Sequence, residues 1–295
     1  MKILFIGCVE SSYKLLEVLL REHKDVAGVI TKERSDYNTD FRDLAPLCRI
    51  YKIPVCYVNN INDTESISFA RGVGADICFC FGWSQLLREE LIGLFPKGII
   101  GFHPAALPYN RGRHPLIWAL ALGLKETAST FFMIDAGADT GDIVSQRIVG
   151  INYEDDAGTL YEKVMAMAVK QEIELVRDLE EGSLNRISQE LKAGNYWRKR
   201  GKADGMIDWR MSSKSIYNLV RSLTEPYIGA HFVYAGKEYK VWKTEEINAD
   251  GIENFEPGKV IAINADGTID VKAGEGGIRL LRFDAFEVAV GDYIL

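Results

Sequence analysis

Several short motifs that identify common enzyme classes are missing from this sequence of 295 residues. It contains no G-x-G-x-x-G loop, no G-x-x-x-x-G-K-[ST] loop and no G-x-S-x-G turn. Dinucleotide-dependent hydride transfer, ATP binding through a P-loop and serine hydrolysis therefore lose their main support. No apolar run reaches the roughly 18 residues that a membrane helix needs. The apolar core at residues 3–6 is too short for a signal peptide, so we expect no membrane partner.

Cysteine is also scarce, and its spacing is uninformative for metals. The five cysteines are an odd number and all lie in the first third of the chain. Their spacing matches neither a disulfide framework nor a zinc site. Cys78 and Cys80 lie in an apolar run, which is typical of a buried strand. We therefore expect reduced thiols, no metal site and a cytoplasmic location.

Positive charge is in deficit, with 35 Lys and Arg against 42 Asp and Glu and a net charge of -7. Proteins whose main partner is nucleic acid usually carry a basic face. The charge balance therefore predicts that nucleic acid is not the main partner.

Apolar runs alternate with amphipathic stretches in the first half of the chain. The runs that we interpret as buried strands span residues 2–8, 26–31, 55–58, 76–81 and 98–102. Helical spacing begins after Ser11 or Ser12, either of which can cap a helix, and recurs over residues 42–51, 63–73, 86–94 and 157–179. The pattern predicts an α/β fold, a Rossmann-like, mostly parallel sheet with helices on both faces.

After Gly205 the sequence pattern changes to short strand-like stretches separated by turns. Ala235-Gly236 and Asp266-Gly267 each separate two strand-like stretches, which is typical of hairpins. We expect a small antiparallel, barrel-like β-domain. The predicted organisation is a catalytic domain at residues 1–190, a linker at 191–205 that includes a basic stretch, and the β-domain at 206–295.

Ligands of mostly parallel sheets bind beyond the carboxyl ends of the strands, and one of the four histidines, His103, directly follows a predicted strand. Asp139 and Asp142 share a later turn. An acid within reach of an imidazole fixes its tautomer and raises its basicity, so the pattern predicts an acid/base pair. The spacing does not decide which acid takes part. The alternatives are a buried structural histidine and an acid that only holds the turn.

Two linked motifs resemble the folate-dependent formyltransferase family. His-Pro-Ala-Ala-Leu-Pro-x-x-Arg-Gly spans residues 103–112, and Asp-x-Gly-x-Asp-Thr-Gly-Asp spans residues 135–142. The resemblance extends to residues 82–85 and to the late blocks Ile207-Asp208-Trp209 and Lys240-Val241-Trp242-Lys243. It therefore covers nearly the whole chain.

The resemblance implies that a substrate amine attacks the formyl carbon of N10-formyltetrahydrofolate. It implies that His103 acts in proton transfer and stabilises the tetrahedral intermediate, and that Asp139 orients His103 and helps to relay the proton. It also implies a folate pocket formed by Gly82, Trp83, Gln85, Leu86, Asp135, Gly137 and Asp139.

One departure from the family pattern concerns the formyl oxygen. The family usually has asparagine two residues before the histidine, where this chain has Gly101. Losing one such donor typically costs about 100- to 1000-fold in rate. The candidates for a substitute are Asn110, a backbone amide and His103 itself.

The acceptor is predicted from the loop after the second strand, because the tRNA-formylating members use a long basic loop there. Residues 32–42 carry three basic and three acidic side chains and form a short loop. The sequence around residues 101–115 resembles the sugar N-formyltransferase branch. We therefore predict a nucleotide-linked amino deoxysugar as acceptor, a role in polysaccharide biosynthesis and, by analogy with that branch, a homodimer.

The substrate contacts are predicted from the loops that follow the strands. Glu10 would hold the sugar amine, and Lys32, Arg111 and Arg113 would meet the diphosphate. Glu10 is equally explained as an acid favoured by a helix dipole, and Lys32 as solvated surface. The alternative functions are methionyl-tRNA formylation, with the basic residues 192–202 touching RNA, and a folate-binding module that lost activity with its asparagine.

Overall fold

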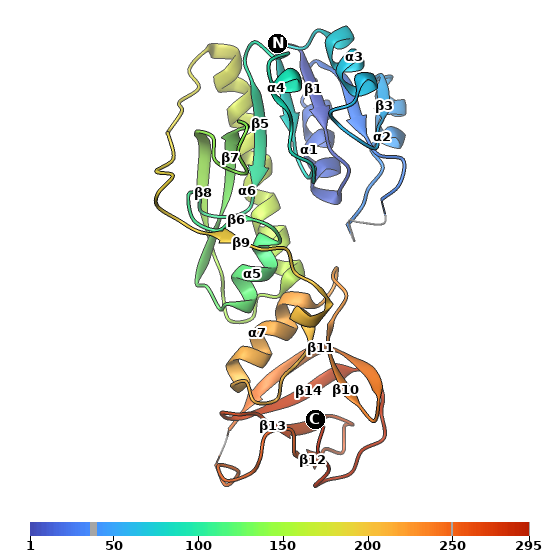
Figure 1. Cartoon of the computed structure of the whole chain (residues 1–295), viewed down its shortest axis with the longest axis vertical. Coiled ribbons are helices and arrows are strands. Elements are labelled where there is room, and N and C mark those ends of the chain that lie inside the picture. Colours follow the sequence, from blue (N-terminus) through green and yellow to red (C-terminus); the bar gives the residue numbers. More distant parts are fainter. Residues whose placement is uncertain (36–39, 249, 295) are drawn as a thin grey trace. The chain divides into compact units, whose positions relative to one another are not determined.

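The computed structural model describes residues 1–35, 40–248 and 250–294 and divides into two compact units (Figure 1). The first unit contains Met1–Gly112, Ala128–Val149 and Lys163–Trp197, and the second contains Arg113–Thr127, Gly150–Glu162 and Arg198–Leu295. Each unit is therefore discontinuous in the sequence. Asp36, one of the acids counted in the loop at 32–42, lies outside the described residues.

A seven-stranded sheet forms the centre of the first unit, in the order β3-β2-β1-β4-β5-β7-β8. The pairs β1–β2, β2–β3, β1–β4 and β4–β5 are parallel, and β5–β7 is antiparallel. The predicted mostly parallel α/β sheet flanked by helices is thus confirmed. Its strands are β1 (Ile3–Ile6), β2 (Val26–Thr31), β3 (Val55–Tyr57), β4 (Ile77–Cys80), β5 (Ile99–His103), β7 (Glu126–Met133) and β8 (Ile143–Gly150).

The helices of this sheet are α1 (Glu10–Arg21), α2 (Ala45–Tyr51), α3 (Thr64–Val73), α4 (Glu89–Ile92) and α6 (Ala157–Glu181). The prediction that Ser11 or Ser12 caps the first helix is wrong, because Val9 holds the N-cap position. The Ser12 hydroxyl instead accepts the Val9 N–H and donates to the Phe81 carbonyl. The predicted helix at 86–94 shortens to α4, because the Asn62 side chain accepts the Arg88 N–H and residue 88 is extended.

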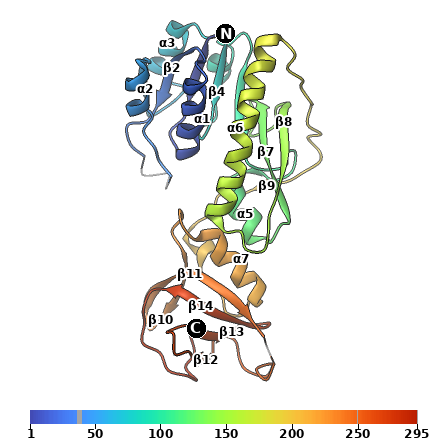
Figure 2. The ribbon, with the colours of Figure 1, turned by 180° about the vertical axis from the view of Figure 1, so that it is seen from behind.

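The long helix α6 begins among residues of the second unit and continues along the sheet of the first (Figure 2). Its Gln171 side chain donates to the Ser129 carbonyl on β7 at 3.2 Å and to the Ser145 hydroxyl on β8 at 2.8 Å. These two hydrogen bonds hold α6 against the strands that follow β5. None of the helices in the described residues combines the length and apolar character of a membrane span.

Glu172, the next residue of α6, is fully buried, and neither carboxylate oxygen has a hydrogen-bond partner among the described residues. Burial raises the pKa of Glu172 well above its usual value, because desolvation disfavours the charged form. Because the pKa of Glu172 is raised in the folded state, the contribution of this group to the free energy of unfolding is fully present below its pKa in the unfolded state. The contribution is lost as the pH rises towards the folded-state pKa.

We therefore expect Glu172→Gln to be more stable than the parent protein at pH 8. The parent loses about 1.4 kcal/mol of unfolding free energy per pH unit between the two pKa values of this group, and the amide does not ionise. Urea unfolding at pH 5, 6.5 and 8 measures both proteins. The difference should widen as the pH rises, and parallel pH curves would contradict the prediction.

The second unit contains a five-stranded antiparallel sheet in the order β10-β11-β14-β13-β12. Ala235 and Gly236 both have positive φ, 49° and 75°, as a two-residue hairpin turn requires. The predicted antiparallel β-domain is confirmed. The elements of the second unit are α5 (Pro115–Ala121), α7 (Ser213–Leu223), β10 (Ala230–Tyr234), β11 (Lys237–Ile247), β12 (Val260–Ile263), β13 (Ile269–Lys272) and β14 (Gly277–Phe283).

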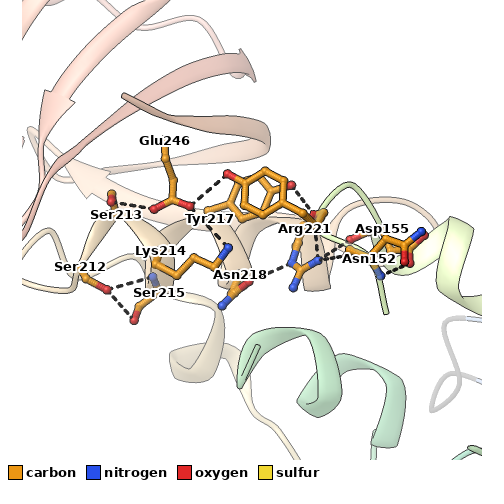
Figure 3. Close-up of polar contacts among 11 residues, drawn as sticks. Asn152, Asp155, Ser212, Ser213, Lys214, Ser215, Tyr217, Asn218, Arg221 and Glu246 are labelled. Atoms are coloured by element: carbon orange, nitrogen blue, oxygen red, sulfur yellow. Dashed lines mark hydrogen bonds and ion pairs between the residues drawn. The ribbon is translucent and has the colours of Figure 1, made fainter. Parts of the chain in front are cut away.

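A polar network around α7 joins three segments of the second unit (Figure 3). Arg221 is 8% exposed and donates through Nη1 to the carbonyls of Asn152, Tyr153 and Asp155 at 2.9–3.0 Å. Its Nε donates to the Asn218 side chain at 2.9 Å. One buried guanidinium thus satisfies three carbonyls of the loop that leads into α6.

Candidate active site

His103 is the last residue of β5 and is 5% exposed. Its Nε2 lies 2.9 Å from the Asn110 carbonyl oxygen. A carbonyl only accepts, so Nε2 carries a hydrogen in this contact. The neutral ring then has its lone pair on Nδ1, which lies 3.8 Å from Asp139 Oδ2. A proton taken up at Nδ1 would face a carboxylate, which is the arrangement that stabilises an imidazolium ion.

The turn that carries the two acids distinguishes them. Asp139 has a positive φ of 57°, and its Oδ2 accepts the Gly112 N–H at 2.9 Å. Asp142 instead accepts the Ser188 hydroxyl at 2.9 Å. Of the two acids that the spacing left open, Asp139 is therefore the one beside His103.

The loop after His103 is held by side chains that the motif analysis did not single out. Thr130, which pairs with His103 across β5 and β7, donates to the Ala105 carbonyl at 2.6 Å. Gln146 donates to the Leu107 carbonyl at 2.9 Å. These partners lie on β7 and β8, and neighbouring residues in the sequence carry no signal for such contacts.

Asn110, a predicted donor to the formyl oxygen, contributes its main chain to the site. Its φ is 64°, which asparagine tolerates better than most residues. Its carbonyl contacts His103, and its N–H donates to the Asn195 side chain at 3.0 Å. Asn195 belongs to the stretch that we interpreted as the start of a linker.

Two family models match the chain and identify the reaction class. The N-terminal model, formyl transferase, matches residues 1–176, and the formyl transferase C-terminal domain matches residues 199–285. The chain belongs to the formyl transferase family. It is therefore an enzyme, and the formyl donor of this family is 10-formyltetrahydrofolate.

Individual members of the family differ in their acceptors. The methionyl-tRNA formyltransferase of Acetivibrio thermocellus is 30% identical over 301 residues, covering 100% of this chain and 96% of the relative. WlaRD, a sugar 3N-formyl transferase solved with dTDP and 5-N-formyl-THF, has a TM-score of 0.69 at 19% identity, covering 95% of this chain and 97% of WlaRD. HypX from Aquifex aeolicus has a TM-score of 0.65 at 18% identity, and the match covers 96% of this chain but 44% of HypX. The two structural likenesses show a shared fold.

Gly101, at the position where the resemblance implied asparagine, lies opposite Phe132 in the pairing of β5 with β7. A Cβ atom added at Gly101 would lie 2.9 Å from Phe132 Cζ and 3.0 Å from Ile134 Cγ1. Real Cβ atoms rarely come so close, so the bulky neighbours explain the glycine.

We expect Gly101→Asn to lower the free energy of unfolding by about 1–3 kcal/mol, because it overpacks the space beside Phe132. Thermal and urea unfolding measure the change. In the Phe132→Ala background the same substitution should cost less, because the ring that it strikes is absent. Equal costs in both backgrounds would show that Phe132 does not select the glycine.

The predicted folate loop at residues 82–86 combines a constrained turn with an exposed apolar side chain. Gly82 has a φ of 65°, and a Cβ there would lie 2.1 Å from Val9 Cγ2. The Trp83 Nε1 atom is buried and has no hydrogen-bond partner among the described residues. Leu86 is 63% exposed and lines an open cavity of about 610 Å³ together with Ala136. An unpaired indole N–H and an exposed leucine at one loop are features that a bound pterin would satisfy.

Other predicted folate residues have partners within the chain. Gln85 accepts the Ile61 N–H and donates to the Asn59 carbonyl, both at 3.0 Å. Asp135 accepts the Gly137 N–H at 2.9 Å and the Thr140 hydroxyl at 2.7 Å. These side chains shape the two loops, and no contact of theirs points to a ligand.

The residues predicted to contact the substrate also differ in whether they have partners within the chain. Glu10 opens α1, and its carboxylate is 42% exposed and 3.9 Å from the Arg42 guanidinium. The Lys32 ammonium lies over the Trp83 ring at 5.2 Å. Arg113 belongs to the second unit. Arg111 is 1% exposed and its guanidinium is bound by Gln189. This burial argues against the diphosphate contact predicted for Arg111, because a buried, paired cation is not available to a ligand.

Proposed function

We propose that this formyltransferase acts on the amino group of a nucleotide-linked amino deoxysugar, with His103 and Asp139 as its proton-transfer pair. Bound 10-formyltetrahydrofolate supplies the carbonyl carbon that the amine attacks. Overall, the amine loses one proton and the nitrogen of the leaving folate gains one. His103 Nδ1 would accept the proton from the amine, and the Asp139 carboxylate would stabilise the charged ring until the proton is passed on.

One observation carries the choice of a small acceptor over tRNA. Three of the five cations of the basic stretch at residues 192–202, which would have to touch RNA, have acceptors within the second unit, namely Arg198, Arg200 and Lys202. Arg198 donates to the Asp204 carboxylate at 2.7 Å, and Lys202 lies 2.5 Å from the Glu238 carboxylate. The hydrogen bond from Lys202, followed by that from Lys240, lowers the pKa of Glu238 to about 2. Arg198 and Lys202 would have to exchange these carboxylates for phosphates, so an RNA contact there would gain less from the release of counterions.

Glu10 supports an amine as the acceptor. Its exposed carboxylate follows β1, at the edge of the sheet where the strands β4 and β5 deliver Gly82 and His103. A carboxylate there would attract a protonated amino sugar. Methionyl-tRNA is the second candidate, because the relative at 30% identity bears that name.

A turnover assay with mass-spectrometric detection tests the proposal. The protein is mixed with 10-formyltetrahydrofolate and a panel of TDP-, UDP- and GDP-linked 3-amino and 4-amino deoxysugars, with methionyl-tRNA in parallel. A formyl mass gain on a sugar is expected, and Glu10→Gln should weaken the use of that sugar. A gain on the tRNA alone would replace the sugar as acceptor. Donor binding without any product would favour a folate-binding module.

A further inference from the structure

The segment between α6 and β9 (Tyr196–Trp197) contacts both loops of the proposed catalytic pair. β9 pairs in parallel with β6 (Arg111–Gly112), so that Arg111 lies opposite Tyr196 and Gly112 opposite Trp197. A Cβ at Gly112 would lie 2.3 Å from the Trp197 carbonyl oxygen, and Gly112 has a φ of 100°. The segment therefore contributes backbone structure to the site and does more than connect two regions.

Gln189 lies at the centre of these contacts. Its Oε1 accepts hydrogen bonds from Arg111 Nε at 3.3 Å and Nη2 at 3.0 Å. Its Nε2 donates to the carbonyls of Asp139 at 3.0 Å and Gly141 at 2.7 Å. One side-chain amide thus uses both of its ends to join the loop after His103 to the turn that carries Asp139.

The turn needs such support, because Asp139 has a positive φ, which costs energy for a residue with a side chain. In that conformation the Asp139 carboxylate reaches His103 and the Gly112 N–H. Arg111, in turn, fixes the orientation of the Gln189 amide. A guanidinium only donates hydrogen bonds, so the oxygen of the amide must face it and the NH₂ group must face the turn.

We propose that Gln189, oriented by the buried Arg111, is a positioning residue for formyl transfer that acts through the backbone of Asp139. This inference rests on the proposed roles of His103 and Asp139. A shift of about 1 Å in a catalytic group is enough to cost about 100-fold in rate. The hydrogen bonds of the Gln189 side chain go to Arg111 and to the carbonyls of Asp139 and Gly141, so its effect on His103 would be indirect.

The variant Gln189→Glu tests the proposal, because it keeps an acceptor for Arg111 and removes both N–H donors to the turn. We expect turnover with 10-formyltetrahydrofolate and whichever acceptor of the panel gives product to fall by about 10- to 100-fold. Glu190→Gln, at the exposed neighbouring residue, is the matched control and should keep full turnover. Full turnover of Gln189→Glu would show that Gln189 serves only to pair Arg111, and would overturn the proposal.

Two further readouts separate positioning from a general loss of structure. Hydrogen exchange of the Gly112 amide, followed by NMR, should speed up in Gln189→Glu because its acceptor, Asp139 Oδ2, is displaced. In the Asp139→Asn background, adding Gln189→Glu should lower turnover by less than a further threefold. The effects of two residues that act as a unit do not add. Unchanged exchange or additive costs would overturn the proposal. Full turnover of Asp139→Asn alone would instead refute the role of Asp139, and the Gly112 exchange would still decide whether Gln189 positions the turn.

Discussion

His103→Asn is expected to reduce the turnover of formyl transfer by about 100- to 10,000-fold, which is the usual contribution of a positioned acid or base. Asparagine cannot exchange a proton near neutral pH. Its amide nitrogen takes the position of Nδ1 and falls short of the Asn110 carbonyl, so the loop after β5 should keep its course through the hydrogen bonds from Thr130 and Gln146. The assay measures formylated acceptor by mass spectrometry and donor binding by calorimetry. Donor affinity should change much less than turnover.

A matched control is available in His23→Asn. His23 is exposed and has a φ of 54°, a conformation that asparagine adopts readily. This variant should match the parent protein in turnover and in stability. If His103→Asn retained turnover within tenfold of the parent, His103 would be a buried structural histidine and the acid/base interpretation would be wrong.

Arg221→Ala is expected to lower the free energy of unfolding by about 3 kcal/mol or more. The substitution removes four hydrogen bonds from a charged group, three of them to the carbonyls of Asn152, Tyr153 and Asp155, and such bonds contribute about 1.5–3 kcal/mol each. The Asn152 and Tyr153 carbonyls each keep a second donor, the Asp155 N–H at 3.3 Å and the Tyr217 hydroxyl at 2.7 Å, so the loss is smaller than the sum. Water entering the space would recover part of the loss. The free energy of unfolding of Arg221→Lys should lie between those of the parent protein and Arg221→Ala. An ammonium group can donate to the carbonyls but lacks the planar arrangement of donors that the guanidinium has.

Urea unfolding monitored by tryptophan fluorescence, to which the buried Trp209 of the second unit contributes, measures this effect. Arg210→Ala is the control, because Arg210 forms an exposed pair with Asp208, and such pairs add little to stability. Its unfolding midpoint should not move. An Arg221→Ala midpoint equal to that of the control would show that the three carbonyls are satisfied without the guanidinium.

The parts of the fold that follow from local patterns were predictable. Residues 26–31 form β2 with the predicted bounds, and the hairpin at Ala235-Gly236 follows from the conformations that those two positions require. The predicted helix at 86–94 failed because a side chain from another loop, Asn62, accepts the Arg88 N–H. Apolar periodicity does not contain that information.

The candidate site shows the same limit. The motifs bring His103 and Asp139 into one hypothesis, but the geometry is needed to prefer Asp139 over Asp142. The sequence predicts that Arg111 meets the diphosphate of a substrate, whereas the structure buries its side chain. Its burial depends on Gln189, a partner 78 residues away. Contacts at that separation follow from the assembled fold and not from any window of the sequence.

The contacts of Gln189 and β9 have a consequence for how these modules can be exchanged. The N-terminal family model ends at residue 176, before either contact begins. A chimera joined at that border would graft a foreign segment onto the turn that carries Asp139. Recombination between relatives should therefore preserve activity when the crossover lies beyond Trp197 and impair it when the crossover lies between residues 176 and 189. The segment that would have to be transferred as one piece therefore extends to Trp197, whereas the N-terminal family model matches only residues 1–176.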